Sequence, residues 1–323
     1  MISKSAIEKT ELAMAAFAAV AMVVLSLIFH PVQINPVQYG LCLPSPDSWG
    51  FQSVWSWGVN TFLIALITLL LFLVNRSYNF VRTTEPTMAA LLLVMTCSGP
   101  WFTQEINTSV LLCLANVVCL GIIFDSYDSP NATREMFILG VVAGMGSMVQ
   151  YAFLPMAFVY IVWALFMKIL RIKETLALVA GLLCPYWIGL GVGWIEISQL
   201  HFPSINPLFS EANNPSDFFL LLASIAFAAV VGFVVTVINT MKLYAGNSRV
   251  NAMNLCISTL GAASVICILV DYDNMVAYIV TLFMACSVQL ANICALWHPR
   301  LPWLVTAIPS LFYLGVFVCS LVL

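Results

Sequence analysis

Four carboxylates in predicted loops are the residues best suited to chemistry, namely Asp47, Glu105, Asp271 and Asp273. A carboxylate can act as the general base that removes a proton from a hydroxyl acceptor during group transfer. Two neighbouring carboxylates can also bind a hard divalent cation, which makes Asp271 and Asp273 a candidate metal site. The alternative is that acidic side chains only keep these loops hydrated. The residue types therefore indicate acid–base chemistry, metal binding or simple solvation.

The elements that must position these carboxylates are apolar helices. Hydrophobic residues make up 62% of the chain and charged residues 8%, whereas a soluble domain carries about 25% charged residues. Apolar stretches recur from end to end, and about 20 such residues cross a bilayer as a helix. The sequence therefore predicts an all-α fold in one integral membrane domain, 1–323, a polytopic transmembrane helix bundle of about 11 spans. The predicted spans are 12–29, 58–74, 87–100, 109–124, 136–149, 152–167, 176–194, 218–239, 252–269, 275–295 and 303–321.

The basic residues indicate how these spans are oriented. When the chain is threaded from a cytoplasmic N-terminus, all 11 lysines and arginines fall on the cytoplasmic side. Acidic residues divide evenly between the two sides, which fits the positive-inside rule because that rule depends on the bases. The sequence therefore predicts an N-terminus inside and, with an odd number of spans, a C-terminus outside.

Two predicted external loops are long enough to contribute to a site, one after the first span and one after the seventh. In the first loop, Trp49 and Trp55 suit an interfacial helix, because indole rings favour the depth of the lipid headgroups. His30 and His201 are the external histidines, one in each loop. For each histidine a structural role is the alternative to a role in binding.

The region 136–167 is the least regular part of the predicted bundle. One helix of that length would reach about 48 Å at 1.5 Å per residue, which exceeds the hydrocarbon core. Pro155 lacks the N–H that a continuous helix would use. We therefore expect two short spans with a break between Gln150 and Pro155, and a single broken helix is the alternative.

The interior of the predicted spans carries amides and hydroxyls instead of charges. Asn116, Gln289 and Asn292 are examples, and we expect them to make hydrogen bonds between helices. Ion-coupled transporters use ionisable groups inside the membrane, so this pattern argues against that class. The sequence also has no phosphate-binding loop, dinucleotide fingerprint or metalloprotease motif, and nothing in it indicates a nucleic-acid partner.

Two predicted cytoplasmic segments carry a resemblance to known proteins. They are Asn75-Arg76-Ser77-Tyr78-Asn79-Phe80-Val81-Arg82, followed by Glu85-Pro86, and Arg134-Glu135-Met136-Phe137-Ile138-Leu139-Gly140. With the overall layout, they resemble an uncharacterised family of polytopic inner-membrane proteins from Bacteroidota, of similar length and span count. That family is in turn distantly similar to the GT-C glycosyltransferases, which take sugars from polyprenyl-phosphate carriers at the outer face. The resemblance implies a multi-pass protein of the bacterial cytoplasmic (inner) membrane with a GT-C-like fold.

The similarity to GT-C enzymes also implies a site. In that pattern the catalytic acid lies in the first external loop, which corresponds to Asp47, and a second acid in the next loop corresponds to Glu105. The residues implied to bind substrate are His30, His201, Trp49 and Trp55. Because no lysine or arginine is predicted outside, these histidines, backbone amides or a divalent metal on the acids would bind the lipid phosphate. The implied activity is transfer of a sugar from a polyprenyl-phosphate-linked donor.

Two other functions fit the same sequence. A non-catalytic membrane subunit or scaffold in envelope assembly or export fits a chain that has modest loops and no buried charge. A transporter of a lipid-linked or hydrophobic substrate is the third hypothesis. The role of Asp47 separates the transferase from the other two, because only the transferase needs the basicity of that carboxylate.

Overall fold

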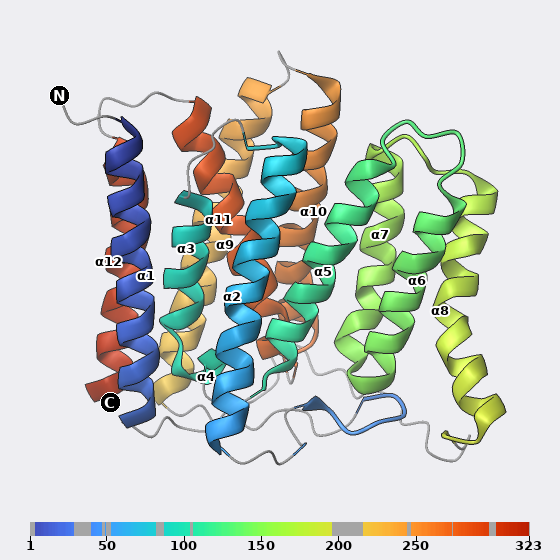
Figure 1. Ribbon diagram of the computed structural model, residues 1–323, viewed down its shortest axis with the longest axis horizontal. Helices are drawn as coiled ribbons and strands as arrows, with labels where there is room; N and C mark the ends of the chain where they lie inside the picture. The colour runs from blue at the N-terminus through green and yellow to red at the C-terminus, as the bar shows by residue number, and fades with distance from the viewer. Residues whose placement is uncertain are drawn as a thin grey trace.

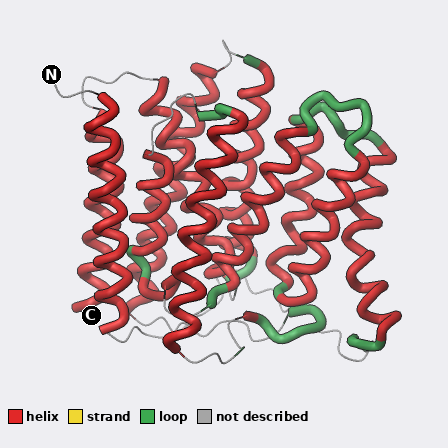
Figure 2. The backbone as a smooth tube through the Cα atoms, in the orientation of Figure 1, coloured by secondary structure: helices red, strands yellow, loops and turns green. Residues whose placement is uncertain are grey.

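The computed structural model describes residues 4–28, 40–46, 49, 53–81, 87–103, 106–195, 216–243, 247–272, 274–296 and 302–322. These residues form helices joined by turns and loops, and they contain no β-strand (Figure 2). The predicted all-α fold is therefore confirmed for the described part of the chain. The α-helices are α1 (Lys4–Ile28), α2 (Ser53–Tyr78), α3 (Thr87–Cys97), α4 (Pro100–Thr103), α5 (Thr108–Asp125), α6 (Thr133–Val149), α7 (Leu154–Phe166), α8 (Ile172–Val192), α9 (Ser216–Leu243), α10 (Ser248–Val270), α11 (Met275–Leu296) and α12 (Pro302–Val322).

Apolar helices make the chain an integral, multi-pass membrane protein. Six described helices, α2, α5, α8, α9, α10 and α11, are long and apolar enough to cross a bilayer, and shorter apolar helices lie at α1, α3, α7 and α12. A helix occupies each range that the sequence predicts as a span, with α3 and the short α4 sharing the third range. The number of spans, their orientation and the identity of the membrane stay predictions.

α11 lies at the centre of the bundle (Figure 1). It packs against α3, α5, α9 and α10, and 94% of its most apolar stretch is buried. α8 lies at the edge of the bundle, and only 22% of its most apolar stretch is buried (Figure 1). Neighbouring helices therefore enclose α11, whereas α8 mostly faces the surroundings of the protein.

α5 ends and α6, α8 and α10 begin at the same end of the bundle (Figure 1), and three basic residues make hydrogen bonds there. Arg171 donates to the carbonyl of Pro130 at 2.7 Å, and Lys173 donates to the side chain of Asn131 at 2.7 Å. Arg249, in the first turn of α10, donates at 3.1 Å to a carbonyl near the end of α5. The positive-inside rule predicts that such a basic end faces the cytoplasm, and the orientation itself stays a prediction.

The break predicted in the middle of the chain is confirmed. α6 ends at Val149, Gln150 has an extended backbone (φ −152°, ψ 122°), and a 3-10 turn at Tyr151–Phe153 leads into α7. Pro155 lies in the first turn of α7, where the N–H that it lacks would have no partner within the helix. α6 and α7 therefore stand beside each other and run in opposite directions (Figure 1).

A segment of the first loop closes the end of α6. The backbone N–H groups of Leu41, Cys42 and Leu43 donate to the carbonyls of Ser147 and Met148 at 3.3, 3.2 and 2.9 Å. The last carbonyls of a helix have no partner inside the helix, so these bonds satisfy groups that would otherwise be unpaired. Burial also raises the pKa of the Cys42 thiol, which keeps it in the unreactive neutral form at pH 7. The segment therefore has a structural role.

α6 and α8 run in the same direction and pack backbone against backbone (Figure 1). A methyl group added to Gly140 would overlap the carbonyl oxygen of Leu178, and one added to Gly181 would overlap the carbonyl oxygen of Phe137. Gly144, one turn after Gly140, makes the same kind of contact with α8. Small residues let membrane helices approach this closely, so these glycines fix α8 to the rest of the bundle.

Candidate functional site

Most residues of the predicted outer-face site lie outside the described residues. These are His30, Asp47, Glu105, His201 and Asp273. Whether they come together therefore stays a prediction. The three predicted site residues that the structure does describe are Trp49, Trp55 and Asp271.

The two tryptophans are both accessible from outside the protein. Trp49 is 44% exposed, and its indole N–H donates to the carbonyl of Pro44 at 3.0 Å. Trp55 is 72% exposed and belongs to the first turn of α2. The exposure of both rings fits the predicted contact with lipid headgroups, and their contact with a bound substrate stays a prediction.

Asp271 is the described member of the predicted metal pair. Its buried carboxylate lies at the end of α10 and accepts a hydrogen bond from the Tyr151 hydroxyl at 3.2 Å. Gln150, beside Tyr151, donates from its side chain to Asn274 at 2.7 Å. These two bonds join the α6–α7 turn to the α10–α11 turn. No group of three His, Cys, Asp or Glu side chains within the described ranges could hold a metal ion.

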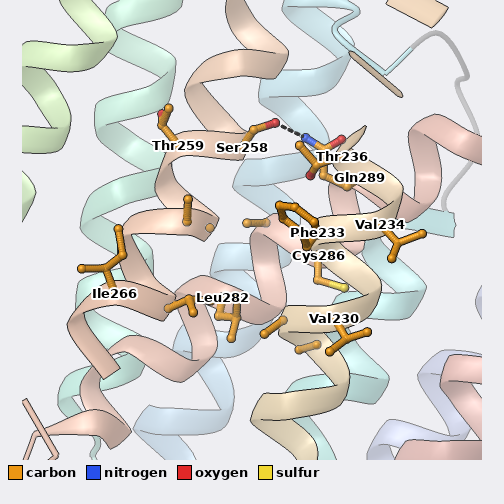
Figure 3. A pocket seen from close by; sticks show the side chains of 17 residues that line it. Val230, Phe233, Val234, Thr236, Ser258, Thr259, Ile266, Leu282, Cys286 and Gln289 are labelled. Atoms are coloured by element: carbon orange, nitrogen blue, oxygen red, sulfur yellow. Dashed lines mark hydrogen bonds between the residues drawn. The ribbon is translucent and has the colours of Figure 1, made fainter. Parts of the chain in front are cut away.

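A groove opens between α9 and α10, with α11 forming its floor (Figure 3). Its volume is about 640 Å³. Small and apolar side chains make up most of its walls, and a few hydroxyl and amide groups complete them. The lining residues are Ala228, Ala229, Val230, Gly232, Phe233, Val234, Thr236, Ser258, Thr259, Gly261, Ala262, Val265, Ile266, Leu282, Ala285, Cys286 and Gln289.

Small residues keep the space between these three helices open. Gly232 on α9, Gly261 on α10 and Ala285 on α11 each add little or no side chain to the walls. A Cβ atom added to Gly232 would lie 3.7 Å from Cys286, which is ordinary contact, so a longer side chain there would project into the groove. Phe233 on α9 is 72% exposed. The groove therefore faces outward from the bundle, toward the surrounding lipid.

Hydrogen-bonding side chains close one end of the groove (Figure 3). The Gln289 amide N–H donates to the Ser258 hydroxyl at 2.9 Å, and the Gln289 side-chain oxygen accepts from Asn239 at 2.8 Å. Thr236 also lines the groove, on α9 (Figure 3). The groove thus combines a long apolar part with a short polar end.

The polar end continues as a buried network that links α10 and α11. The side chain of Asn254 accepts from Asn292 at 2.6 Å and donates to the carbonyl of Phe80 at 3.2 Å. Gln289 and Asn292 therefore make the hydrogen bonds between helices that the sequence predicted. These bonds hold together the helices on which the polar end of the groove is built.

Replacing Asn254 by leucine is expected to lower the free energy of unfolding by about 1 kcal/mol, because Asn292 and the Phe80 carbonyl would each lose a partner. Thermal unfolding in mild detergent measures this loss. Ser264→Ala is the matched control, since the Ser264 hydroxyl donates only to a carbonyl of its own helix. The double variant Asn254→Leu/Asn292→Leu should recover part of the stability. A larger loss in the double variant would contradict this account of the network.

Comparison with known proteins identifies no relative of this chain. No protein-family model, curated protein or solved structure matches it. The apolar helices and the geometry of the groove are therefore the features that indicate its function.

The groove was not among the sequence predictions. Those predictions placed chemistry in the external loops, whereas the groove is built from residues within the predicted spans. The sequence feature that could have indicated the groove is the presence of Gly232, Gly261 and Ala285 in otherwise bulky apolar helices. Hydropathy alone does not reveal which small residues face one another, because it measures the polarity of a helix and not its neighbours.

Proposed function

We propose that this integral membrane protein binds the hydrocarbon chain of a lipid-linked or hydrophobic substrate in the groove between α9 and α10. The supporting observation is the outward-facing groove of about 640 Å³ with mainly apolar walls. Sites for small molecules usually have volumes of about 300–1,000 Å³ and are mostly apolar with a few polar groups. The groove matches this description in size and in lining.

The chemistry of the walls favours hydrocarbon over water as the occupant. A bound water molecule needs several hydrogen-bonding partners, and the apolar part of the groove offers few. Lipid tails are as apolar as these walls, so the hydrophobic effect adds little to binding inside a bilayer. Selectivity must then come from the close fit of the chain to the walls and from the polar end.

Gly232→Leu is expected to reduce binding of a long-chain lipid about tenfold or more, because the added side chain projects into the groove. Crosslinking of the purified protein by a photoreactive fatty alcohol, followed by mass spectrometry of the labelled peptide, measures this binding. In the wild type we expect the label on α9, α10 or α11.

The matched control for this substitution is Gly315→Leu on α12. At Gly315 an added Cβ atom would have no heavy atom within 4 Å. Leucine there would therefore change the surface of α12 without filling the groove. Labelling of the control should equal that of the wild type. Equal labelling of Gly232→Leu and wild type would reject the groove as the binding site, and the scaffold hypothesis would then become the better one.

We further propose that the protein is a GT-C-like glycosyltransferase at the outer face of a bacterial inner membrane, and that its donor, a polyprenyl-phosphate-linked sugar, is bound at the predicted outer-face residues and not in the groove. The resemblance of the sequence supports this proposal, with Asp47 as the general base and Glu105 as the second acid. A transporter of lipid-linked substrates is the alternative, and the requirement for Asp47 separates the two activities.

A further inference from the structure

The polar end of the groove is uncharged. The described residues that line the groove include no Lys, Arg, Asp, Glu or His, and the polar ones apart from Cys286 are Thr236, Ser258, Thr259 and Gln289. An ionised group placed there would lie inside the bilayer without a partner of opposite charge, which is strongly unfavourable. The polar end therefore suits a neutral group on the occupant.

Thr236 differs from the other hydroxyl groups around the groove. Ser258 and Thr259 each donate at 2.8 Å to a carbonyl of their own helix, and Thr240 does the same at 2.9 Å. The Thr236 hydroxyl lines the groove but makes no hydrogen bond within the described part of the chain. An unpaired hydroxyl inside a bilayer is costly, so a partner supplied by the occupant would stabilise it.

Gln289 offers a second hydrogen-bonding group at the same place. A side-chain amide has two N–H donors, and Gln289 uses one of them toward Ser258 at 2.9 Å. The Gln289 amide nitrogen makes no second hydrogen bond within the described residues. Asn239, three residues after Thr236 on α9, donates to the Gln289 side chain at 2.8 Å, and Thr236 and Gln289 both line the groove (Figure 3), so one small polar group could contact both.

We propose that the groove selects a long-chain molecule whose polar group at this end is a neutral hydroxyl, as in a long-chain alcohol. The inference rests on the proposed lipid-binding function. A hydroxyl is both donor and acceptor, so it can accept from Gln289 while it bonds to Thr236. A bare hydrocarbon would leave Thr236 unpaired, and a phosphate would bring a charge that has no partner there.

A competition experiment with three chains of equal length tests this selection. The purified full-length protein in lipid nanodiscs is labelled by the photoreactive probe in the presence of hexadecanol, hexadecane or hexadecyl phosphate at equal mole fractions. We expect hexadecanol to reduce labelling at a mole fraction about fivefold lower than hexadecane does. A difference of about fivefold in affinity corresponds to about one hydrogen bond. Hexadecyl phosphate should compete no better than hexadecane.

Thr236→Val removes the hydroxyl and keeps a similar shape, so it should reduce competition by hexadecanol to the level of hexadecane. Thr240→Val, one turn later on α9, is the matched control, because the Thr240 hydroxyl already bonds to its own helix. This control should keep the preference for hexadecanol.

The possible failures can be told apart. If none of the three chains reduces labelling of the wild type, the proposed lipid-binding function itself is wrong. If all three compete equally and Thr236→Val changes nothing, the groove binds chains but the proposed selection of a hydroxyl is wrong. A preference for hexadecyl phosphate would also overturn the inference and would indicate an anionic lipid instead.

Discussion

Gly140→Ala is expected to destabilise the protein by about 2 kcal/mol, a large loss for a single added methyl group. Alanine favours a helix more than glycine does, so only packing can make this change unfavourable. The added carbon would overlap the Leu178 carbonyl oxygen, and it would lie 2.9 Å from the Leu182 nitrogen and 3.0 Å from the Gly181 Cα atom. These are backbone atoms, so α6 and α8 would have to move apart.

Gly191→Ala is the control, because it makes the same change on α8 where an added Cβ atom meets nothing within 4 Å. That variant should be as stable as the wild type, or more stable by up to about 1 kcal/mol. Thermal unfolding of both variants in one detergent measures the difference. Equal stability of the two variants would mean that α6 and α8 are not in backbone contact.

Asp47→Asn is expected to lower sugar transfer about a hundredfold or more, if the chain is the proposed transferase. Asparagine keeps the shape of aspartate but cannot accept a proton from the acceptor hydroxyl. Protein level and membrane insertion should not change, because the substitution removes only the basicity of one loop residue. Transfer from a polyprenyl-phosphate-linked sugar donor, assayed in membranes that contain each variant, measures the effect.

The control for the loss of a carboxylate is Asp128→Asn. Asp128 is an exposed residue with a left-handed backbone (φ 57°), a conformation that asparagine also adopts readily. This variant should retain full transfer. If Asp47→Asn transfers sugar as well as the wild type, the transferase proposal is rejected while the lipid-binding groove remains to be tested by Gly232→Leu.

The helices could be predicted because they depend on features that are local in the sequence. Long apolar stretches gave the positions of the helices, and Pro155 gave the place of the break after α6. The amides inside the spans were also informative, since a buried amide must find a partner. Asn116 accepts a hydrogen bond from Tyr160 at 3.0 Å, as this reasoning expects.

The arrangement of the helices could not be predicted in the same way. The contact of α6 with α8 depends on glycines in two separate segments, and the groove depends on small residues in three. A hydropathy pattern shows that each helix is apolar, but it does not show which faces meet. The loop residues Asp47 and Glu105 were selected for their chemistry alone, and they lie outside the described residues.

The central position of α11 constrains the order in which the protein assembles during synthesis. The ribosome makes a chain from its N-terminus, so the ten described α-helices that precede α11 leave it before α11 does. Yet α3, α5, α9 and α10 all pack against α11 in the finished protein. These helices must therefore enter the membrane before their common partner exists, and they can pack around α11 only after it has been made. A chain truncated before α11 would leave four helices without the surface that unites them.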